Sequence, residues 1–210
     1  MADAKRQADS PGVTLWFTGL PCSGKSTISQ LVYQHLRQAG RKVELLDGDQ
    51  VRQHLTKGLG FSKEGRDENI RRIGYVCHLL TRNGVVAIAA AISPYRAVRD
   101  EVRRLIGSFV EIYLDCPVEV CMQRDVKGMY KKALAGELQG FTGVSDPYEP
   151  PLHPELTLHT DKEPAEACAA RLLRRLAEMG YLPSVRVPPE PYTPEEEAAI
   201  RRRLEQLGYL

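Results

Sequence analysis

The residues from Gly19 to Thr27 form the most specific chemical motif of this sequence. They are GLPCSGKST and match the pattern G-x-x-x-x-G-K-[ST], between an apolar run, Val13 to Thr18, and a segment with helical spacing, Lys25 to Gln38. The two glycines allow a turn that points backbone N–H groups inward, while Lys25 can reach the β- and γ-phosphates and Ser26 can ligate Mg²⁺. In this context the pattern predicts a nucleoside triphosphate site rather than an ordinary glycine turn.

Two carboxylates follow the next apolar run, Val43 to Leu46, in the tripeptide Asp47-Gly48-Asp49. Because parallel strands end at the same edge of a sheet, we expect both aspartates beside the phosphate-binding loop, where they could hold Mg²⁺ or accept a proton from an attacking hydroxyl. The structural alternative is that strand-end aspartates form loops or cap helices. Asp115, at the end of a later strand, is a rival candidate for the metal ligand.

Two further stretches carry cations and aromatic rings. Arg66, Asn69 and Arg72 recur at intervals of three, so they would share a helical face suited to an anionic acceptor; a solvated basic face is the alternative. The stretch from Arg124 to Pro154 lacks clear periodicity and is too long for a passive connector, so we interpret it as a mobile lid. The lid residues that could close over two nucleotides and exclude water are Lys127, Tyr130, Lys131, Lys132 and Phe141.

The elements that must position these residues alternate between apolar runs and helical patterns. This alternation predicts an α/β fold of the three-layer P-loop NTPase type, with a parallel sheet and helices on both faces. We expect strands over Val13 to Thr18, Val43 to Leu46, Val85 to Ile92, Phe109 to Leu114 and Leu156 to Leu158, and helices over about Lys25 to Gln38, Asp67 to Arg82, Ala97 to Ile106 and Pro164 to Met179.

The composition sets limits on the function. The 210 residues are 42% hydrophobic and 27% charged, which suits one core, and the formal net charge of +2 gives no general reason to expect nucleic acid or membrane binding. No apolar stretch approaches the roughly 18 residues of a membrane span. Five scattered cysteines without a C-x-x-C pair suggest neither a disulfide framework nor a zinc site, so we expect a cytoplasmic protein.

The chain resembles the adenylylsulfate kinase family over about Gly12 to Leu182. The resemblance is carried, in order and at family spacing, by GLPCSGKST, LDGDQVR, LTKGLGFS, ENIRRIG, AISPYR and DVKGMYKKALAGELQGFTGVSDPYEPP. It implies transfer of the γ-phosphoryl group of ATP to the ribose 3′-hydroxyl of adenosine 5′-phosphosulfate (APS), giving 3′-phosphoadenosine 5′-phosphosulfate and ADP in sulfate assimilation. It also implies Mg²⁺ as cofactor, ATP and APS as binding partners, and a homodimer.

The resemblance assigns roles to individual residues. Asp47 or Asp49 would orient the 3′-hydroxyl or serve as its base, and with Lys25 and Lys127 they form the expected catalytic set. Ser26 and Asp47 would hold Mg²⁺. The expected ATP-binding residues are Gly19, Leu20, Pro21, Cys22, Ser23, Gly24, Lys25, Ser26, Thr27 and Arg124, the last by stacking on adenine. The expected acceptor-binding residues are Asp49, Arg52, Phe61, Arg66, Asn69, Ile92, Ser93, Lys127 and Phe141, with Phe61 and Phe141 sandwiching the acceptor adenine.

One departure from the family is notable. Gly65 stands where the family pattern F-S-x-x-D-R has an aspartate, so a carboxylate is missing; Glu64 or Asp67 could take its place. Two alternative functions follow: a non-catalytic, nucleotide-sensing P-loop module, or a small kinase with another hydroxyl acceptor. A non-aromatic acceptor would not require the Phe61 and Phe141 pair.

Three segments organise the chain in this interpretation. Residues 1–11 form an N-terminal extension, and residues 12–183 form the P-loop kinase domain with its lid at about 124–154. Residues 184–210 contain a proline-rich linker and an amphipathic helix that opens at Thr193-Pro194. This helix could dock on the chain itself, on a second subunit or on another partner.

Overall fold

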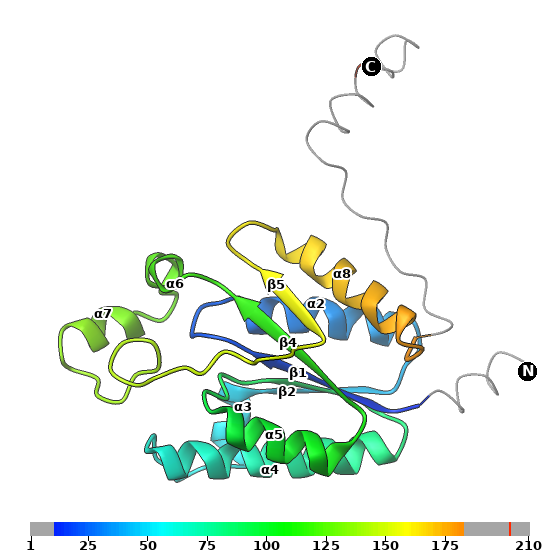
Figure 1. The fold of residues 1–210 in the computed structure, drawn as a ribbon, viewed down its shortest axis with the longest axis horizontal. Coiled ribbons are helices and arrows are strands. Elements are labelled where there is room, and N and C mark those ends of the chain that lie inside the picture. Colours follow the sequence, from blue (N-terminus) through cyan, green and yellow to red (C-terminus); the bar gives the residue numbers. More distant parts are fainter. Residues whose placement is uncertain (1–10, 183–201, 203–210) are drawn as a thin grey trace, which may run out of the picture.

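A five-stranded parallel sheet forms the centre of the protein, in a computed structural model that describes residues 11–182 and residue 202 (Figure 1). The strand order is β2-β3-β1-β4-β5, and every pairing is parallel. This order confirms the predicted α/β class. The strands are Val13–Thr18 (β1), Val43–Asp47 (β2), Val86–Ala90 (β3), Phe109–Asp115 (β4) and Leu156–His159 (β5).

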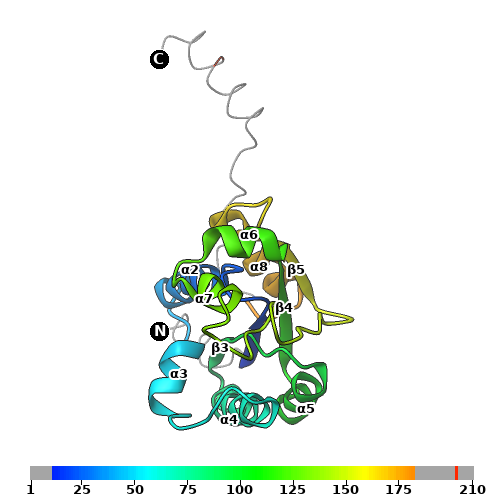
Figure 2. The same ribbon diagram turned by 90° about the vertical axis from the view of Figure 1, so that its left-hand side faces the viewer.

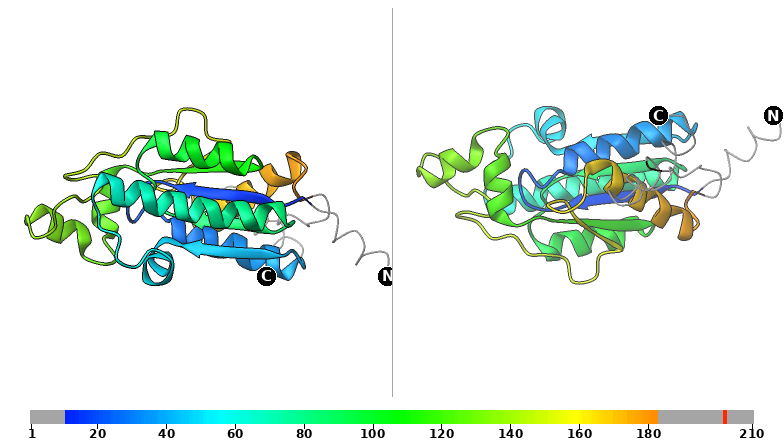
Figure 3. Two further views of the ribbon diagram at one scale, coloured as in Figure 1. Left: turned by 90° about the horizontal axis from the view of Figure 1, so that it is seen from below. Right: turned by 90° about the horizontal axis from the view of Figure 1, so that it is seen from above.

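Long helices cover both faces of the sheet, as predicted. α2 and α8 lie on one face, and α4 and α5 lie on the other, which gives three layers (Figures 1 and 3). These helices span Lys25–Gln38 (α2), Lys63–Arg82 (α4), Arg96–Ile106 (α5) and Ala165–Glu178 (α8).

The hydrophobic core is divided by the central strand β1, all of whose residues are buried. Successive side chains of a strand point to opposite faces. Leu15 and Phe17 therefore pack in the cluster that includes Val32 of α2, while Trp16 packs in the cluster that includes Ile73 of α4. Burial on both faces explains why the inner strands β1 and β3 are largely apolar runs.

The carboxyl ends of all five strands lie at one edge, where three short helices gather (Figure 2). The sequence analysis did not predict these helices, because six or seven residues are too few to show a periodicity. α7 lies inside the stretch without clear periodicity that we interpret as a mobile lid. The three helices are Gly48–His54 (α3), Val118–Arg124 (α6) and Met129–Leu134 (α7).

Some predicted boundaries shift by a few residues. α4 begins at Lys63 rather than at Asp67, because the Ser62 hydroxyl accepts a hydrogen bond from the Gly65 N–H at 3.2 Å and caps the helix. The predicted N-terminal extension lies almost entirely outside the described residues, and so does the C-terminal helix, apart from Arg202. Within residues 11–182 no helix has the length and apolar character needed to cross a membrane.

Candidate active site

The phosphate-binding loop joins β1 to α2 in a conformation that glycine makes possible. Gly24, at the N-cap of α2, has φ 97°, and Gly19 has φ 150°, where an added Cβ would lie 2.7 Å from the Leu114 carbonyl oxygen. The Lys25 ammonium donates to the Gly19 and Leu20 carbonyl oxygens at 2.9 and 2.7 Å. Its burial lowers the pKa of Lys25 to about 8. The loop thus holds a desolvated cation at the centre of its backbone turn.

Asp47 connects this loop to the end of β2. The Ser26 hydroxyl donates to Asp47 Oδ2 at 2.7 Å, and Asp47 Oδ1 accepts the Asp49 N–H at 3.0 Å as the N-cap of α3. The sequence analysis set a functional role of Asp47 against a capping role, and the geometry accommodates both. Hydroxyl and carboxylate oxygens are ligands that Mg²⁺ accepts in proteins, so Ser26 and Asp47 fit the expected ion.

Asp49 lies next to Asp47 and contacts the lid. Lys127, which follows α6, donates to Asp49 Oδ2, and both side chains are more than half exposed. This hydrogen bond with Asp49 raises the pKa of Lys127 and outweighs the opposing effect of desolvation. The structure therefore brings together three residues of the expected catalytic set from three segments: Asp47, Asp49 and Lys127.

Arg52 of α3 and Phe61, in the loop that follows α3, form a second part of the site. The Arg52 guanidinium lies 4.4 Å from the centre of the Phe61 ring and donates to the Leu59 carbonyl oxygen at 3.0 Å. Burial lowers the pKa of Arg52, and the neighbouring Arg66 adds to the effect. Phe61 is 58% exposed. A large exposed ring flanked by a guanidinium is suited to bind an aromatic, anionic ligand.

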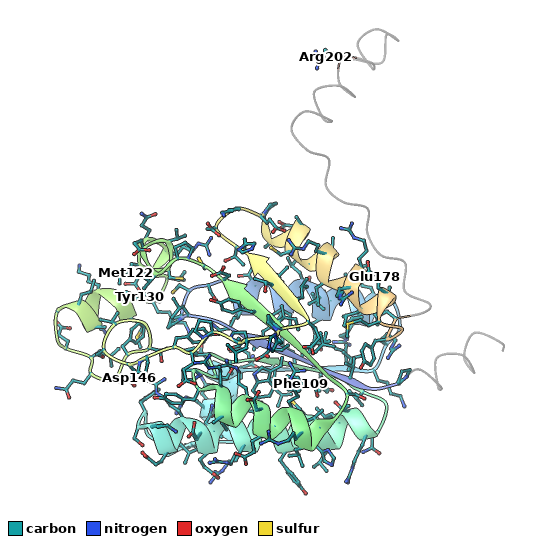
Figure 4. All side chains as sticks on the ribbon, viewed as in Figure 1. Phe109, Met122, Tyr130, Asp146, Glu178 and Arg202 are labelled. Atoms are coloured by element: carbon teal, nitrogen blue, oxygen red, sulfur yellow. The ribbon has the colours of Figure 1, made fainter. Side chains whose placement is uncertain are left out.

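Arg66 ties α4 to the lid. Its guanidinium is buried and donates to the Thr142 hydroxyl at 3.0 Å and to the Gly140 carbonyl oxygen, and it lies 3.6 Å from Asp146 Oδ2. Figure 4 shows Asp146 among the lid elements, near the end of the molecule where α6 and α7 lie. In this arrangement N–H groups of Arg66 bond to protein atoms of the lid. Arg66 therefore holds the lid in place beside the expected binding site of the phosphoryl acceptor.

Asn69 and Arg72, which the spacing predicts on one helical face, differ in how exposed they are. Asn69 is buried, and its Oδ1 accepts a hydrogen bond from the Thr56 hydroxyl at 2.7 Å. Arg72 instead forms a half-exposed ion pair with Glu68 at 2.8 Å along α4. Of these three residues, Arg66 and Asn69 are buried near the site. Arg72 is exposed to solvent, as expected if the cluster were only a solvated basic face.

Phe141 lies in the lid but is not open to a ligand. Its ring is 8% exposed and packs edge-on against Tyr130, with centroids 4.9 Å apart. The Tyr130 hydroxyl donates to the Pro21 carbonyl oxygen at 3.1 Å and so joins the lid to the phosphate-binding loop. The expected stacking of Phe141 opposite Phe61 therefore requires a rearrangement of the lid.

Ile92 and Ser93 follow β3 at the same edge. The Ser93 hydroxyl accepts from the Trp16 indole N–H at 3.1 Å and donates to Thr18 Oγ1 at 3.1 Å, and the residue is 1% exposed. The Ile92 carbonyl oxygen accepts from the Thr18 hydroxyl at 2.8 Å. A hydroxyl engaged in this way suits a positioning role and not that of a free nucleophile.

Arg124 lies between the phosphate-binding loop and the end of β5. It donates to the Thr160 carbonyl oxygen at 2.5 Å and to the Cys22 carbonyl oxygen at 3.4 Å. Thr160 in turn donates from its hydroxyl to the Ser23 carbonyl oxygen at 2.9 Å. The sequence analysis missed Thr160, whose only signal is its position directly after the last strand. Asp115, the rival metal ligand, instead lies 3.3 Å from His159 Nδ1.

A cavity of about 480 Å³ opens between the phosphate-binding loop and residues 143–150. Leu20 contributes from the loop, and Tyr113 and Tyr148, stacked with centroids 6.1 Å apart, contribute from β4 and the lid. This volume falls in the usual range for small-molecule sites. Of the expected site residues only Leu20 lines this cavity, so it lies beside the phosphate-binding loop, and the paired aspartates and the guanidinium groups described above are outside its lining.

Comparisons with known proteins show which family this chain is similar to. The profile of the family described as Adenylylsulphate kinase matches residues 11–159. The adenylyl-sulfate kinase of Rippkaea orientalis is 59% identical over 171 residues, which cover 81% of this chain and 94% of that protein.

Two solved structures extend the comparison to the fold. The Mycobacterium tuberculosis APS kinase CysC in complex with AMPPNP and APS is 39% identical, with a TM-score of 0.76 over 79% of this chain and 98% of that one. The protein APE1195 is 42% identical, also with a TM-score of 0.76, over 81% and 98% of the two chains. Because a family profile matches most of the described residues and a relative is 59% identical over nearly its whole length, the chain belongs to the adenylylsulphate kinase family.

Proposed function

We propose that this protein transfers the γ-phosphoryl group of ATP to the ribose 3′-hydroxyl of APS at the carboxyl edge of the sheet. The observation that carries the proposal is the chain of contacts from Ser26 to Asp47, from Asp47 to Asp49, and from Asp49 to Lys127. These contacts place a triphosphate-binding loop, two carboxylates and a lid cation next to one another. Family membership supplies the identity of donor and acceptor.

The donor is held by the phosphate-binding loop. Backbone N–H groups from Gly19 to Thr27 bind the phosphates, and Lys25 exchanges its carbonyl partners for the β- and γ-phosphate oxygens. Ser26 and Asp47 would hold Mg²⁺, which when bound neutralises charge on the phosphate oxygens. Arg124, which donates to the Thr160 and Cys22 carbonyl oxygens beside this loop, would stack on the adenine.

The two aspartates divide the remaining work according to their contacts. Both carboxylate oxygens of Asp47 are occupied, by Ser26 and by the Asp49 N–H, which suits a fixed ligand. Asp49 is exposed, and within the part of the chain that the structure describes its carboxylate bonds only to the ammonium group of Lys127. Asp49 is therefore the better placed of the two to orient the 3′-hydroxyl and accept its proton, while Lys127 turns to the transferred phosphoryl group.

The acceptor is bound by the neighbouring side chains. Phe61 offers an exposed ring for the adenine, Phe141 approaches from the lid, and Arg52 and Arg66 provide positive charge for the phosphosulfate. Asn69, Ile92 and Ser93 would support these acceptor-binding residues from behind, since Asn69 and Ser93 are buried.

A coupled assay tests the proposal. Purified protein with Mg-ATP and APS should release ADP, and Asp49→Ala should lower kcat by about a thousandfold, the usual scale for losing a catalytic group and its electrostatic effect. Asp115→Asn is the matched control: it changes a strand-end aspartate that pairs with His159, and it should leave kcat within about twofold. Absence of ADP release by the wild-type protein at any APS concentration would reject the function. Equal losses in the two variants would reject the assignment of Asp49.

Two further expectations belong to this proposal. All five cysteines are free thiols, which supports a reducing compartment such as the cytoplasm. A homodimer is tested by light scattering of the full chain, where the mass of one chain, 23.5 kDa, would contradict it.

A further inference from the structure

Ser93 is held in a backbone conformation that non-glycine residues rarely adopt. Its φ is 41°, in the left-handed region, where a side chain with a Cβ is strained. Such a residue persists only where its surroundings over-determine it. Trp16 and Thr18 bind its hydroxyl from β1, and Arg99 binds its carbonyl oxygen from α5 at 2.6 Å.

Arg99 joins three separate segments through one guanidinium. Besides the Ser93 carbonyl oxygen, it donates to Glu111 Oε1 of β4 at 2.9 Å and to the Glu149 carbonyl oxygen at 2.7 Å. The side chain is 2% exposed. The planar fork of arginine can serve three acceptors at once, which the single ammonium of lysine cannot do with the same geometry.

Glu149 belongs to the last part of the lid, which leads back toward β5; residues 147–150 are here called the return segment. Its N–H donates to the Pro94 carbonyl oxygen at 2.8 Å, and its carboxylate accepts the Arg96 N–H at 2.8 Å. The preceding residue, Tyr148, shares a hydrogen bond with Thr18 at 2.9 Å. The return segment is thus fastened to the residues that follow β3, here called the acceptor loop, residues 92–95.

We propose that Arg99 is a positioning residue for the acceptor side of the site: it fixes the Ser93 carbonyl oxygen and the return segment in one arrangement before APS binds. This inference rests on the proposed function, because residues 92–95 form the acceptor wall only in that function. Arg99 touches neither substrate. It acts through Ser93 and Glu149, so its loss weakens APS binding and leaves the ATP side, which is built on β1 and α2, in place.

Arg103 offers a comparison within the same helix. It also pairs with Glu111, at 3.1 Å, and with Glu155, at 2.6 Å, and its guanidinium lies 4.8 Å from the centre of the Phe109 ring, but none of these contacts reaches Ser93 or Glu149. The two arginines therefore share one buried carboxylate and differ in whether they hold the acceptor loop. An effect that follows from the ionic cluster alone would appear in variants of both.

The test compares Arg99→Lys with the matched control Arg103→Lys in initial-rate assays on the full chain. Arg99→Lys should raise the KM for APS about tenfold, the loss expected for charged hydrogen bonds, with less than about threefold change in kcat and in the KM for ATP. Arg103→Lys should leave both KM values within about twofold. Equal effects of the two variants, or an equal rise in both KM values for Arg99→Lys, would overturn the proposal.

Trp16 gives a second readout that needs no substrate, because it is the single tryptophan of the chain and donates to Ser93. Release of the acceptor loop in Arg99→Lys should shift its emission and increase its quenching by acrylamide more than Arg103→Lys does, because Arg103 reaches Trp16 only through the Phe109 ring. Unchanged emission and quenching in folded Arg99→Lys would overturn the proposal. If the wild type lacked APS turnover, the proposed function would fail, yet this signal would still decide whether Arg99 holds Ser93.

A milder variant covers the case in which Arg99→Lys does not fold. Tyr148→Phe removes the hydrogen bond to Thr18 and keeps the ring that stacks on Tyr113. It should raise the KM for APS about threefold, as for one neutral hydrogen bond, without changing the KM for ATP. A KM for APS equal to that of the wild type would count against the fastened return segment.

Discussion

Gly65, the residue that departs from the family pattern, makes a close contact that a side chain would break. A Cβ at this position would lie 2.7 Å from the Gly60 carbonyl oxygen and 3.1 Å from the Gly60 carbonyl carbon. Ordinary contacts begin near 3.4 Å, so in Gly65→Ala the Gly60 backbone must retreat by roughly 0.7 Å. The structure thus explains the glycine by the path of the loop in front of α4.

The shift of the Gly60 backbone affects the expected APS site through Arg52. This arginine donates to the Leu59 carbonyl oxygen at 3.0 Å and to the Gly60 carbonyl oxygen at 3.4 Å. The longer bond breaks first when Gly60 moves, and Phe61 moves with its neighbour. Loss of one partly exposed hydrogen bond costs about 1 kcal/mol, so Gly65→Ala should raise the KM for APS roughly fivefold.

Stability should change much less than substrate binding. Alanine is favoured over glycine inside a helix by about 1 kcal/mol, which offsets the cost of moving the loop. Gly60→Ala is the matched control, because a Cβ at Gly60 meets nothing within 4 Å. Initial rates at varied APS, with melting temperatures for both variants, make the test. A KM for APS in Gly65→Ala that equals that of Gly60→Ala would refute the reasoning.

Three shorter predictions concern the other parts of the structure. Because burial lowers the pKa of Lys25 to about 8, its charge is lost as the pH rises through that value, and calorimetry should show weaker binding of a non-hydrolysable ATP analogue at pH 9 than at pH 7, by about tenfold. In Gly74→Ala the new Cβ would lie 2.4 Å from Val102 Cγ1, so overpacking of about 1–3 kcal/mol should lower the melting temperature, and adding Val102→Ala should recover part of the loss. Arg124→Ala removes the contact with Thr160 and should raise the KM for ATP, but not for APS, by about tenfold.

The fold could be predicted where the signal is local and long. β1 and the helix α2 were predicted with the observed boundaries, because an apolar run and a helical period each extend over enough residues. α3, α6 and α7 were missed, since a helix of two turns shows no period and is held by what it packs against. Each of these short helices lies at the edge where substrates are expected, so the least predictable elements are those nearest the chemistry.

The site residues also divide into those that a local sequence pattern predicts and those that depend on contacts between distant segments. Lys25 bonds to carbonyl groups within six residues of itself, so a contiguous motif is sufficient to recognise it. Arg99 acts on Glu149, fifty positions away, and nothing in its own neighbourhood distinguishes it from Arg103. The resemblance assigns Phe141 to the acceptor adenine, and in this structure Tyr130, from a helix too short to predict, packs against its ring. The residues expected to bind ATP are thus consecutive in the sequence, whereas those expected to bind APS depend on contacts between distant residues. A substitution in this chain can therefore alter APS binding while every recognisable motif stays intact.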